Sequence, residues 1–290
     1  MAFFVMDRNG TEDAVDVFIG KQIKTQEANH VMPELLDRMF SLKGKTALVT
    51  GGYKGIGLAI SEVFAGAGAK LALAARSGDI CKSTAASIET QFGVEAYGLA
   101  LDVQNSHQID RALEEIISRF GKIDILVNCA GIDSSHKPFT EITEEDMNNV
   151  MKINFYGTFL VSKAVVQEMI KQKSGKIINV ASILGKVAAA TMADYCVSKS
   201  AIIQLTRVMA LDLMRYNIQV NALCPGYFLT DINRKYFESD PTAEKFIRKV
   251  IPMNRIGQVD ELKSSALYLA TCPSFLTGSE IYVDGGSTVV

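Results

Sequence analysis

From residue 45 onward, the chain alternates short apolar runs with longer segments that have the amphipathic pattern of helices. The apolar runs cover residues 46–50, 70–75, 94–102, 123–128, 176–181, 218–224 and 280–284. Because these runs are continuous and not alternating, they are typical of strands that are covered on both faces. Strands separated by helices favour right-handed βαβ units. The pattern therefore predicts the α/β class with a doubly wound parallel sheet.

The same alternation predicts the domain organisation. No linker rich in Pro or Ser interrupts residues 42–290, which we expect to form a single domain. Residues 1–41 are predicted to be a partly helical N-terminal extension, with an apolar stripe at Val15, Phe18, Ile19, Gln22 and Ile23. A second short helix is expected from Pro33 to near Phe40, and its apolar side chains favour docking on the core or on a neighbouring subunit. A surface extension without a catalytic role is the alternative.

Charge and hydropathy exclude several classes of protein. The 290 residues carry 30 basic and 32 acidic side chains, for a net charge of -2. A general nucleic-acid-binding protein usually has a clear basic excess. The apolar runs are far shorter than the ~20 residues of a membrane-spanning helix. The apolar segment Met1–Met6 ends at Asp7, too early for the core of a signal peptide. We therefore expect a cytoplasmic protein without nucleic-acid or membrane partners.

Cysteine and histidine are placed without an evident metal or redox pattern. The five cysteines are widely spaced and include no C-x-x-C pair, which favours buried, reduced thiols. The three histidines do not pair with other ligands at metal spacing. We therefore predict neither a metal site nor a histidine-based catalytic triad.

A glycine-rich turn joins the first predicted strand to the first predicted helix and reads T-G-G-Y-K-G-I-G at residues 50–57. Glycines at such a turn allow a tight bend and a close approach to a pyrophosphate. The N-terminus of the following helix presents free N–H groups to the anion. The turn therefore predicts a dinucleotide site that involves Gly51, Tyr53, Lys54, Gly55, Ile56 and Gly57. A purely structural turn is the alternative.

The spacing T-G-x-x-x-G-x-G resembles that of the short-chain dehydrogenase/reductase family, and further signatures follow in the family's order. N-C-A-G at residues 128–131 is similar to the family's N-N-A-G, with Cys129 as the departure. Asn154 lies in a predicted helix, Ser182 ends the fifth strand, and residues 195–199 read Y-x-x-x-K. Pro225 and Gly226, with Thr230 beyond them, follow the sixth strand. The resemblance spans residues 43–290 and implies a Rossmann-type fold.

Tyr195 and Lys199 are four residues apart and share one face of a predicted helix. An isolated tyrosine has a pKa of about 10, which is too high for efficient proton transfer at neutral pH. An adjacent ammonium favours the phenolate, so we expect Lys199 to lower the pKa of Tyr195. A surface Tyr and Lys without a joint role is the alternative.

The family resemblance implies a role for each of four residues. Tyr195 would give a proton to a ketone in reduction and remove it from an alcohol in oxidation. Ser182 would hydrogen-bond the same oxygen, Lys199 would also hold the nicotinamide ribose, and Asn154 would support a water relay to Lys199. Ser182 as a local backbone cap and Asn154 as a structural residue are the alternatives.

The second predicted strand indicates which nicotinamide cofactor binds. Ala75 stands where NAD-selective relatives usually place an acidic residue, and Arg76 follows it. Arg76 and Lys54 together predict a clamp for a 2′-phosphate, so NADP(H) is favoured and NAD(H) is possible. An Arg76 that stacks on the adenine and a Lys54 that is simply solvated are the alternatives.

Other cofactor contacts follow from the resemblance alone. Asp102 and Val103 would contact the adenine, although a simple turn residue is the alternative for Asp102. Asn128, Ala130 and Gly131 would line the cofactor path. The turn with Pro225, Gly226 and Thr230 would reach the nicotinamide carboxamide.

Substrate specificity is carried by loops and is the least predictable part of such a site. Aromatic side chains between residues 227 and 251 would suit a hydroxysteroid or ketosteroid, or would instead pack a lid helix; they are Tyr227, Phe228, Tyr236, Phe237 and Phe246. The P-G-Y segment and the L-K-G-K entry at residues 42–45 are similar to those of sugar and polyol ketoreductases.

We therefore predict an oxidoreductase that interconverts a small-molecule secondary alcohol and a ketone. A 3-ketoacyl-thioester reductase and a non-catalytic dinucleotide-binding redox sensor are the alternatives. The segment 275–286 resembles the family's closing strand, which often lies at a subunit contact, and implies a homotetramer.

Overall fold

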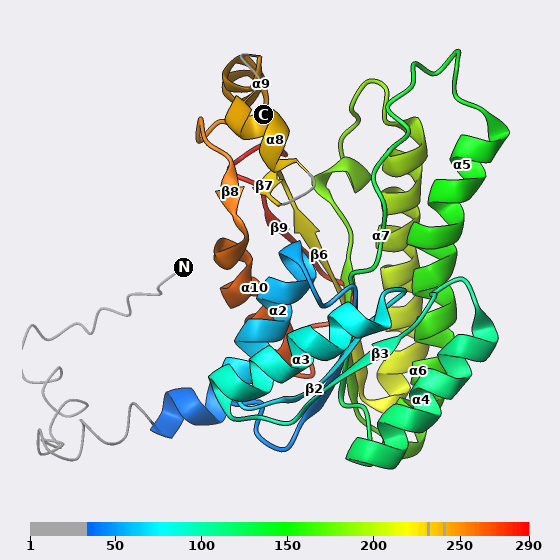
Figure 1. Cartoon of the computed structure of the whole chain (residues 1–290), viewed down its shortest axis with the longest axis vertical. Helices are drawn as coiled ribbons and strands as arrows, with labels where there is room; N and C mark the ends of the chain where they lie inside the picture. The colour runs from blue at the N-terminus through cyan, green and yellow to red at the C-terminus, as the bar shows by residue number, and fades with distance from the viewer. Residues whose placement is uncertain (1–33, 231–232, 240–241, 290) are drawn as a thin grey trace, which may run out of the picture. The chain divides into compact units, whose positions relative to one another are not determined.

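The computed structural model describes residues 34–230, 233–239 and 242–289, and its centre is a parallel sheet of seven strands (Figure 1). The strand order is β3-β2-β1-β4-β5-β6-β9. The bounds are β1 Thr46–Thr50, β2 Lys70–Ala75, β3 Ala96–Ala100, β4 Ile125–Asn128, β5 Gly175–Val180, β6 Ile218–Pro225 and β9 Glu280–Val283. The order runs outward in both directions from β1 and β4, which confirms the predicted doubly wound sheet of the Rossmann type.

Helices cover both faces of this sheet and form two apolar layers. On one face lie α2 (Gly55–Gly66), α3 (Gly78–Phe92) and α10 (Lys263–Thr271), whose buried side chains include Phe64, Ile88 and Leu269. On the other lie α4 (Ser106–Phe120), α6 (Gly157–Gln172) and α7 (Ala193–Leu213), with Ile116 and Met169 in the core. Ala47 and Val49 of β1 pack in one layer and Leu48 packs in the other, so the middle of this strand carries apolar side chains on both faces.

Local signals set the ends of the covering helices. The Asn105 side chain accepts a hydrogen bond from the Gln108 backbone at the start of α4, and Gly121 ends that helix with a φ of 81°. Thr143 and Asp146 form a capping box at the start of α5 (Glu144–Val150). These signals mark both ends of α4 and the start of α5.

Three short elements were not predicted from the sequence. The short strands β7 (Phe228–Leu229) and β8 (Gly257–Gln258) pair with each other near α8 (Arg234–Ser239) and α9 (Ala243–Val250). A π-helical turn over Met151–Tyr156, η2, joins α5 to α6. No helix in the described part of the chain is long and apolar enough to cross a membrane.

The N-terminal extension is described only in part. The predicted stripe from Val15 to Ile23 and the predicted helix start at Pro33 lie outside the described residues. Residues 34–40 are helical, and Leu35, Leu36 and Met39 are exposed. Residues 42–290 group into one compact unit by their internal contacts.

Candidate active site

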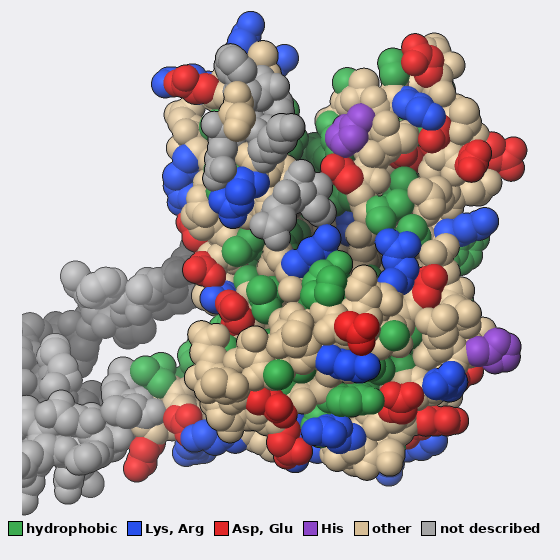
Figure 2. Space-filling view, in the orientation of Figure 1, with side chains coloured by type: hydrophobic (Ala, Val, Ile, Leu, Met, Phe, Trp, Pro, Cys, Tyr) green, Lys and Arg blue, Asp and Glu red, His purple; other side chains and the backbone are tan. Residues whose placement is uncertain are grey.

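The predicted site residues gather at the edge of the sheet where the parallel strands end. β1 and β4 are neighbours in the sheet although a long stretch of chain separates them. Open α/β sheets bind their ligands at such a switch point, outside the carboxyl ends of the strands. The surface is hollowed between the part that carries α9 and the part that carries α5 (Figure 2). The loops after β1, β4, β5 and β6 therefore meet at one place.

Tyr195, Ser182 and Lys199 lie together beneath this edge. Tyr195 and Lys199 are on the first turns of α7, and Ser182 lies two residues after the end of β5. Ser182 forms a side-chain hydrogen bond with the Tyr195 hydroxyl, and its own oxygen accepts one from the Leu184 backbone at 3.1 Å. The Lys199 ammonium lies 5.5 Å from the centre of the Tyr195 ring and donates to the Val180 carbonyl oxygen at 2.9 Å. Ser182 thus both caps the local backbone and reaches the tyrosine.

The expected effect of Lys199 on Tyr195 is not what the structure shows. Burial raises the pKa of Tyr195 above its ordinary value, the Ser182 hydrogen bond acts in the opposite direction, and the negative charge of Asp133 adds to the rise. Burial also lowers the pKa of Lys199 to about 8, and Cys129 and Cys224 act in the opposite direction. Desolvation, rather than an ammonium–phenolate pair, dominates both groups in this structure.

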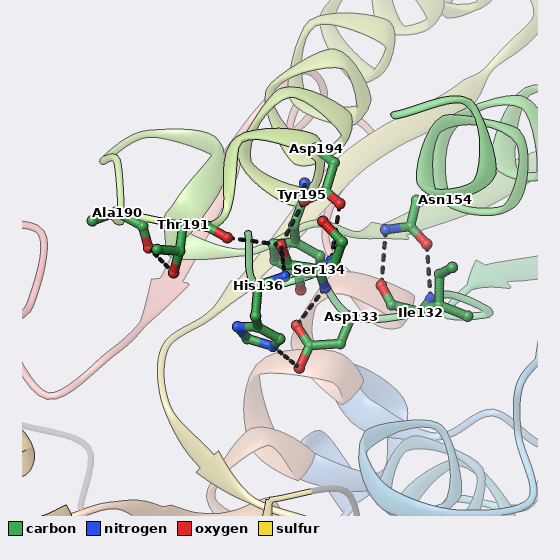
Figure 3. Close-up of polar contacts among 10 residues, drawn as sticks. Ile132, Asp133, Ser134, His136, Asn154, Ala190, Thr191, Asp194 and Tyr195 are labelled. Atoms are coloured by element: carbon green, nitrogen blue, oxygen red, sulfur yellow. Dashed lines mark hydrogen bonds and ion pairs between the residues drawn. The ribbon is translucent and has the colours of Figure 1, made fainter. Parts of the chain in front are cut away.

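Asn154 is fully buried in the π-helical turn η2 and holds the chain after β4. Its side-chain oxygen accepts from the Ile132 backbone N–H at 2.8 Å, and its side-chain N–H donates to the Ile132 carbonyl at 3.1 Å (Figure 3). The same N–H group donates to the Ser198 hydroxyl at 3.1 Å. An extra residue in a helical turn often re-aims one side chain at a functional site. Here it places an amide between the β4 loop and α7.

Asp194 is a site residue that the sequence analysis missed. It is fully buried at the start of α7, and its carboxylate accepts from the Ser134 hydroxyl at 2.5 Å, the Ser135 backbone at 2.9 Å and the Tyr195 backbone at 2.7 Å (Figure 3). Burial acts to raise the pKa of Asp194, but these hydrogen bonds outweigh it and lower the pKa below its ordinary value. The ionised carboxylate of Asp194 therefore holds the loop after β4 at the start of α7, next to Tyr195.

The glycine-rich turn has the shape that a bound phosphate requires. A Cβ added to Gly57 would lie 2.2 Å from the Gly51 carbonyl oxygen, so the turn closes on itself without room for a side chain. Gly51 and Gly55 have positive φ angles of 70° and 51°. No side chain caps the N-terminus of α2, which leaves its first N–H groups directed at the turn. These features fit the pyrophosphate of a dinucleotide.

Thr50 and Cys129 explain why the N-C-A-G motif tolerates its departure. The Thr50 hydroxyl at the end of β1 accepts from the backbone N–H groups of Cys129 and Ala130, at 3.1 and 3.2 Å. Burial raises the pKa of the Cys129 thiol to about 11, although the charge of Lys199 opposes this, so the thiol stays neutral. At residue 129 this contact uses only the backbone N–H group, so it does not depend on which side chain stands there. Thr50 itself was not predicted as a site residue.

The remaining residues of the motif adjoin the same place. Asn128 lies within the sheet, and its side-chain N–H group donates to the Ser162 hydroxyl at 2.8 Å and to the side-chain oxygen of Asn179 at 2.9 Å. A Cβ on Gly131 would lie 3.1 Å from the Asn154 side-chain oxygen and 4.0 Å from the Lys199 ammonium. Gly131 therefore leaves this approach to Lys199 open.

The residues predicted to select the cofactor lie at neighbouring strand ends. Thr50 pairs with Ala74 in the register of β1 and β2, so Lys54 and Arg76 follow adjacent strands. Both side chains are exposed, and the Lys54 ammonium lies 5.4 Å from the centre of the Tyr53 ring. Asp102 accepts from the Gln104 backbone at 3.0 Å and shapes a local turn.

The segments after β3 and β6 complete the surroundings. The Val103 side chain is buried against Gly157 of α6. Gly226 passes close to the backbone of Asp284, and the Thr230 methyl group lies 3.6 Å from the Cβ position of Gly55. The turn after β6 therefore meets the glycine-rich turn, although 175 positions separate residues 55 and 230.

The aromatic side chains beyond β6 mainly pack on one another. The rings of Tyr227 and Phe246 meet edge to face with centres 5.1 Å apart, and Phe237 lies 6.2 Å from Phe246. The side chain of Tyr236 lies outside the described residues. A pocket of about 350 Å³ borders this segment, and Tyr227, Phe228, Met253, Tyr282 and Asp284 are among its lining residues. Elsewhere, the described part of the chain has no group of three or more His, Cys, Asp or Glu side chains arranged to hold a metal ion.

Comparison with known proteins decides the family. Residues 51–288 match the family model described as enoyl-(acyl carrier protein) reductase. A crystal structure of a gluconate 5-dehydrogenase from Burkholderia cenocepacia J2315 in complex with NADP and tartrate superposes with a TM-score of 0.83 at 37% identity, covering 88% of this chain and 99% of that chain. The chain belongs to the short-chain dehydrogenase/reductase family.

Two curated members of this family are similar over nearly their whole length. The 5-keto-D-gluconate 5-reductase of Escherichia coli (strain K12) is 36% identical over 255 residues, which are 88% of this chain and 99% of the relative. The sorbitol dehydrogenase of Cereibacter sphaeroides is 38% identical over 256 residues, 85% of this chain and 98% of the relative. As a short-chain dehydrogenase/reductase, the protein is an oxidoreductase that interconverts a secondary alcohol and a ketone.

Proposed function

We propose that this enzyme reduces a ketone of the sugar or polyol type with NADPH and oxidises the matching secondary alcohol with NADP⁺. The observation that carries the proposal is the cluster of buried Ser182, buried Lys199 and half-buried Tyr195, at the sheet edge where α2 presents an uncapped N-terminus. The relatives named for 5-keto-D-gluconate and for sorbitol support this substrate class. The packing of Tyr227, Phe237 and Phe246 on one another favours a lid segment over a steroid-binding wall.

The protein's part in the chemistry is binding, orientation and proton transfer. When bound, the nicotinamide supplies the hydride. Tyr195 donates a proton to the ketone oxygen in reduction and accepts it from the alcohol in oxidation. Ser182 hydrogen-bonds the same oxygen as negative charge develops there. Lys199 holds the ribose hydroxyls of the cofactor and supplies positive charge beneath the tyrosine.

Asn154 is a positioning residue in this proposal. Both polar atoms of its side chain are engaged by Ile132 and Ser198, so it acts by fixing the β4 loop and α7. A water relay to Lys199, as expected from the family, would have to use backbone groups nearby.

The exposed cations at the ends of β1 and β2 support NADP(H) as the cofactor, with NAD(H) as the alternative. Arg76 is an exposed cation after β2, and no carboxylate stands at Ala75 to hold an unphosphorylated ribose. The first turn of α2 would bind the pyrophosphate, and the Thr230 turn would cover the nicotinamide end. The complex of the gluconate 5-dehydrogenase with NADP is in line with this preference.

Initial rates against a substrate panel test the proposal. We expect NADPH-dependent reduction of keto-sugars to exceed that of steroid ketones and 3-oxoacyl thioesters by at least tenfold in kcat/KM. Arg76→Ala should raise the KM for NADPH about tenfold and leave that for NADH within twofold, because it removes a phosphate contact worth ~1.4 kcal/mol. Faster turnover of a thioester would establish the 3-ketoacyl reductase instead. Tight NADPH binding with no turnover of any ketone would favour a redox sensor.

The pKa of Lys199 predicts the pH profile of reduction. Below pH 8 the ammonium form dominates, and above it the neutral amine dominates, since burial lowers the pKa to about 8. We expect kcat/KM for ketone reduction to fall about tenfold per pH unit above that value, because the charge beneath Tyr195 is lost. Steady-state rates from pH 6 to 10 measure it. Lys199→Met should retain a small residual rate without this inflection, and the same inflection in the variant would assign it to another group.

We also propose a cytoplasmic homotetramer. The five cysteines are free thiols, a state that a reducing compartment maintains. Two separate exposed apolar groups support assembly by more than one interface. Leu211 and Met214 lie at the end of α7 and just beyond it, while Tyr268 and Phe275 lie on and after α10.

A further inference from the structure

We propose that Asp133 makes the enzyme prefer uncharged polyhydroxy substrates over polyol carboxylates. This inference rests on the proposed sugar or polyol activity and narrows its substrate class. It concerns one side chain of the loop after β4, next to the tyrosine that would meet the reacting oxygen.

The position of Asp133 is fixed from both sides. Ile132 is held by the Asn154 amide through two hydrogen bonds of 2.8 and 3.1 Å. On the other side, Ser134 and Ser135 bind the buried Asp194 carboxylate at 2.5 and 2.9 Å, and Asp194 directly precedes Tyr195 (Figure 3). Asp133 therefore stands at a defined place beside Tyr195 and does not belong to a loose loop end.

The carboxylate of Asp133 is oriented but still accessible. One oxygen accepts from the Ser134 backbone at 2.8 Å, and the other lies 3.2 Å from the His136 ring nitrogen. The Asp133 side chain keeps 47% of its surface exposed. A half-exposed carboxylate with unused acceptor positions can take hydrogen bonds from substrate hydroxyl groups.

The charged groups around Asp133 do not cancel its charge at the tyrosine. The Asp194 carboxylate adds a second negative charge on the same side. Lys137 is bound to both oxygens of Asp146 at 2.7 and 2.9 Å, and the Lys199 ammonium is buried against the Val180 carbonyl. His136 is charged only when protonated. In agreement, the charge of Asp133 contributes to the raised pKa of Tyr195.

A substrate whose carbonyl oxygen is hydrogen-bonded to Tyr195 brings its neighbouring substituents close to this carboxylate. A hydroxymethyl group there donates a hydrogen bond, whereas a carboxylate meets a like charge. For partly exposed charges at such separations, we expect a discrimination of about tenfold. Because of Asp133, the substrate preference of this enzyme would differ from that of a reductase that acts on a sugar acid.

D-Sorbitol and D-gluconate form a matched pair of substrates, because they differ only at C1, where one has a hydroxymethyl group and the other a carboxylate. The like-charge contact arises when the adjacent C2 hydroxyl is the one oxidised, so the position of the new ketone is determined for both products. With NADP⁺, we expect kcat/KM for sorbitol to exceed that for gluconate in the wild type. Asp133→Asn should lower this ratio about tenfold, mainly by accelerating gluconate oxidation. The substitution preserves size and one acceptor oxygen, so folding is expected to be unaffected, and thermal unfolding checks this.

Glu168→Gln is the control, because it removes the same charge from α6, where Glu168 pairs with Lys171. It should leave the ratio unchanged within twofold. A wild-type preference for gluconate, or an equal ratio in wild type and Asp133→Asn, would overturn the inference while the polyol activity stands. If neither compound is oxidised and neither binds to the NADP⁺ complex by calorimetry, both the proposed function and this inference are wrong.

Discussion

Tyr195→Phe is expected to lower kcat/KM by ~10²- to ~10⁴-fold, the range in which a positioned acid or base contributes. The substitution removes one oxygen atom and keeps the aromatic ring on the first turn of α7. The hydroxyl is hydrogen-bonded to Ser182, and the Lys199 ammonium lies near the ring. Stopped-flow or steady-state rates with the best substrate of the panel measure the loss.

The loss must be confined to turnover for this assignment to hold. The dissociation constant for NADPH, measured by fluorescence titration, should change less than threefold, because the phenol oxygen is not needed to bind the dinucleotide. Tyr268→Phe, at an exposed position on α10, is the matched control and should keep full activity. Turnover of Tyr195→Phe within tenfold of the wild type would remove Tyr195 as the acid and base.

Gly57→Ala is expected to combine a loss of stability with a loss of cofactor affinity. The added methyl group would lie 2.2 Å from the Gly51 carbonyl oxygen and 2.8 Å from its carbonyl carbon, so the turn and α2 must move apart. Overpacking of this kind costs about 2–3 kcal/mol in the free energy of unfolding. That change corresponds to a melting temperature lower by about 5–10 °C.

Binding of NADPH to Gly57→Ala should weaken by at least tenfold, because the backbone N–H groups that face the pyrophosphate are displaced. Gly66→Ala on the same helix is the control, since its methyl group would make only an ordinary contact of 3.7 Å with Phe92. We expect that control to be as stable as the wild type or more stable. Calorimetric unfolding and NADPH titration of both variants compare the two sites, and equal behaviour would contradict the tight turn.

The strands could be predicted because they are buried on both faces. β1 and β2 begin and end where the sequence pattern placed them. β3 and β4 begin two residues later than expected, at Ala96 and Ile125. Val94 and Ile123 stand two residues before these strands. Their apolar character extended the predicted runs, but apolarity alone does not mark the residue at which backbone pairing starts.

Ser182, Tyr195 and Lys199, and the positioning residue Asn154, could be found because they belong to short motifs with fixed spacing. Asp194 and Thr50 could not, since their importance depends on partners that are distant in the sequence. An acidic residue in the first turn of a helix is favourable for its dipole alone and gives no sign of a tie to Ser134. The π-helical turn at Asn154 has no comparable local signal and follows from the packing of η2 against α7.

The pKa of Tyr195 shows a different limit of sequence reasoning. The spacing of Tyr195 and Lys199 puts both on one helix face, but it carries no information on desolvation. In the structure, the Lys199 ammonium donates to the Val180 carbonyl oxygen. Burial raises the pKa of Tyr195 and lowers that of Lys199, so it favours the neutral form of both groups. A charge pair inferred from spacing needs the solvent exposure of both partners before its sign can be assigned.

The ties that hold the β4 loop have a consequence for how this enzyme acquires activity. They join residues 22, 59 and 60 positions apart in the chain. Contacts of such sequence separation form only after long loops have closed, which makes them late events in folding. A chain with its helices formed but these loops still open would lack an aligned tyrosine. Recovery of turnover during refolding is therefore a more stringent measure of the native state than recovery of helical structure.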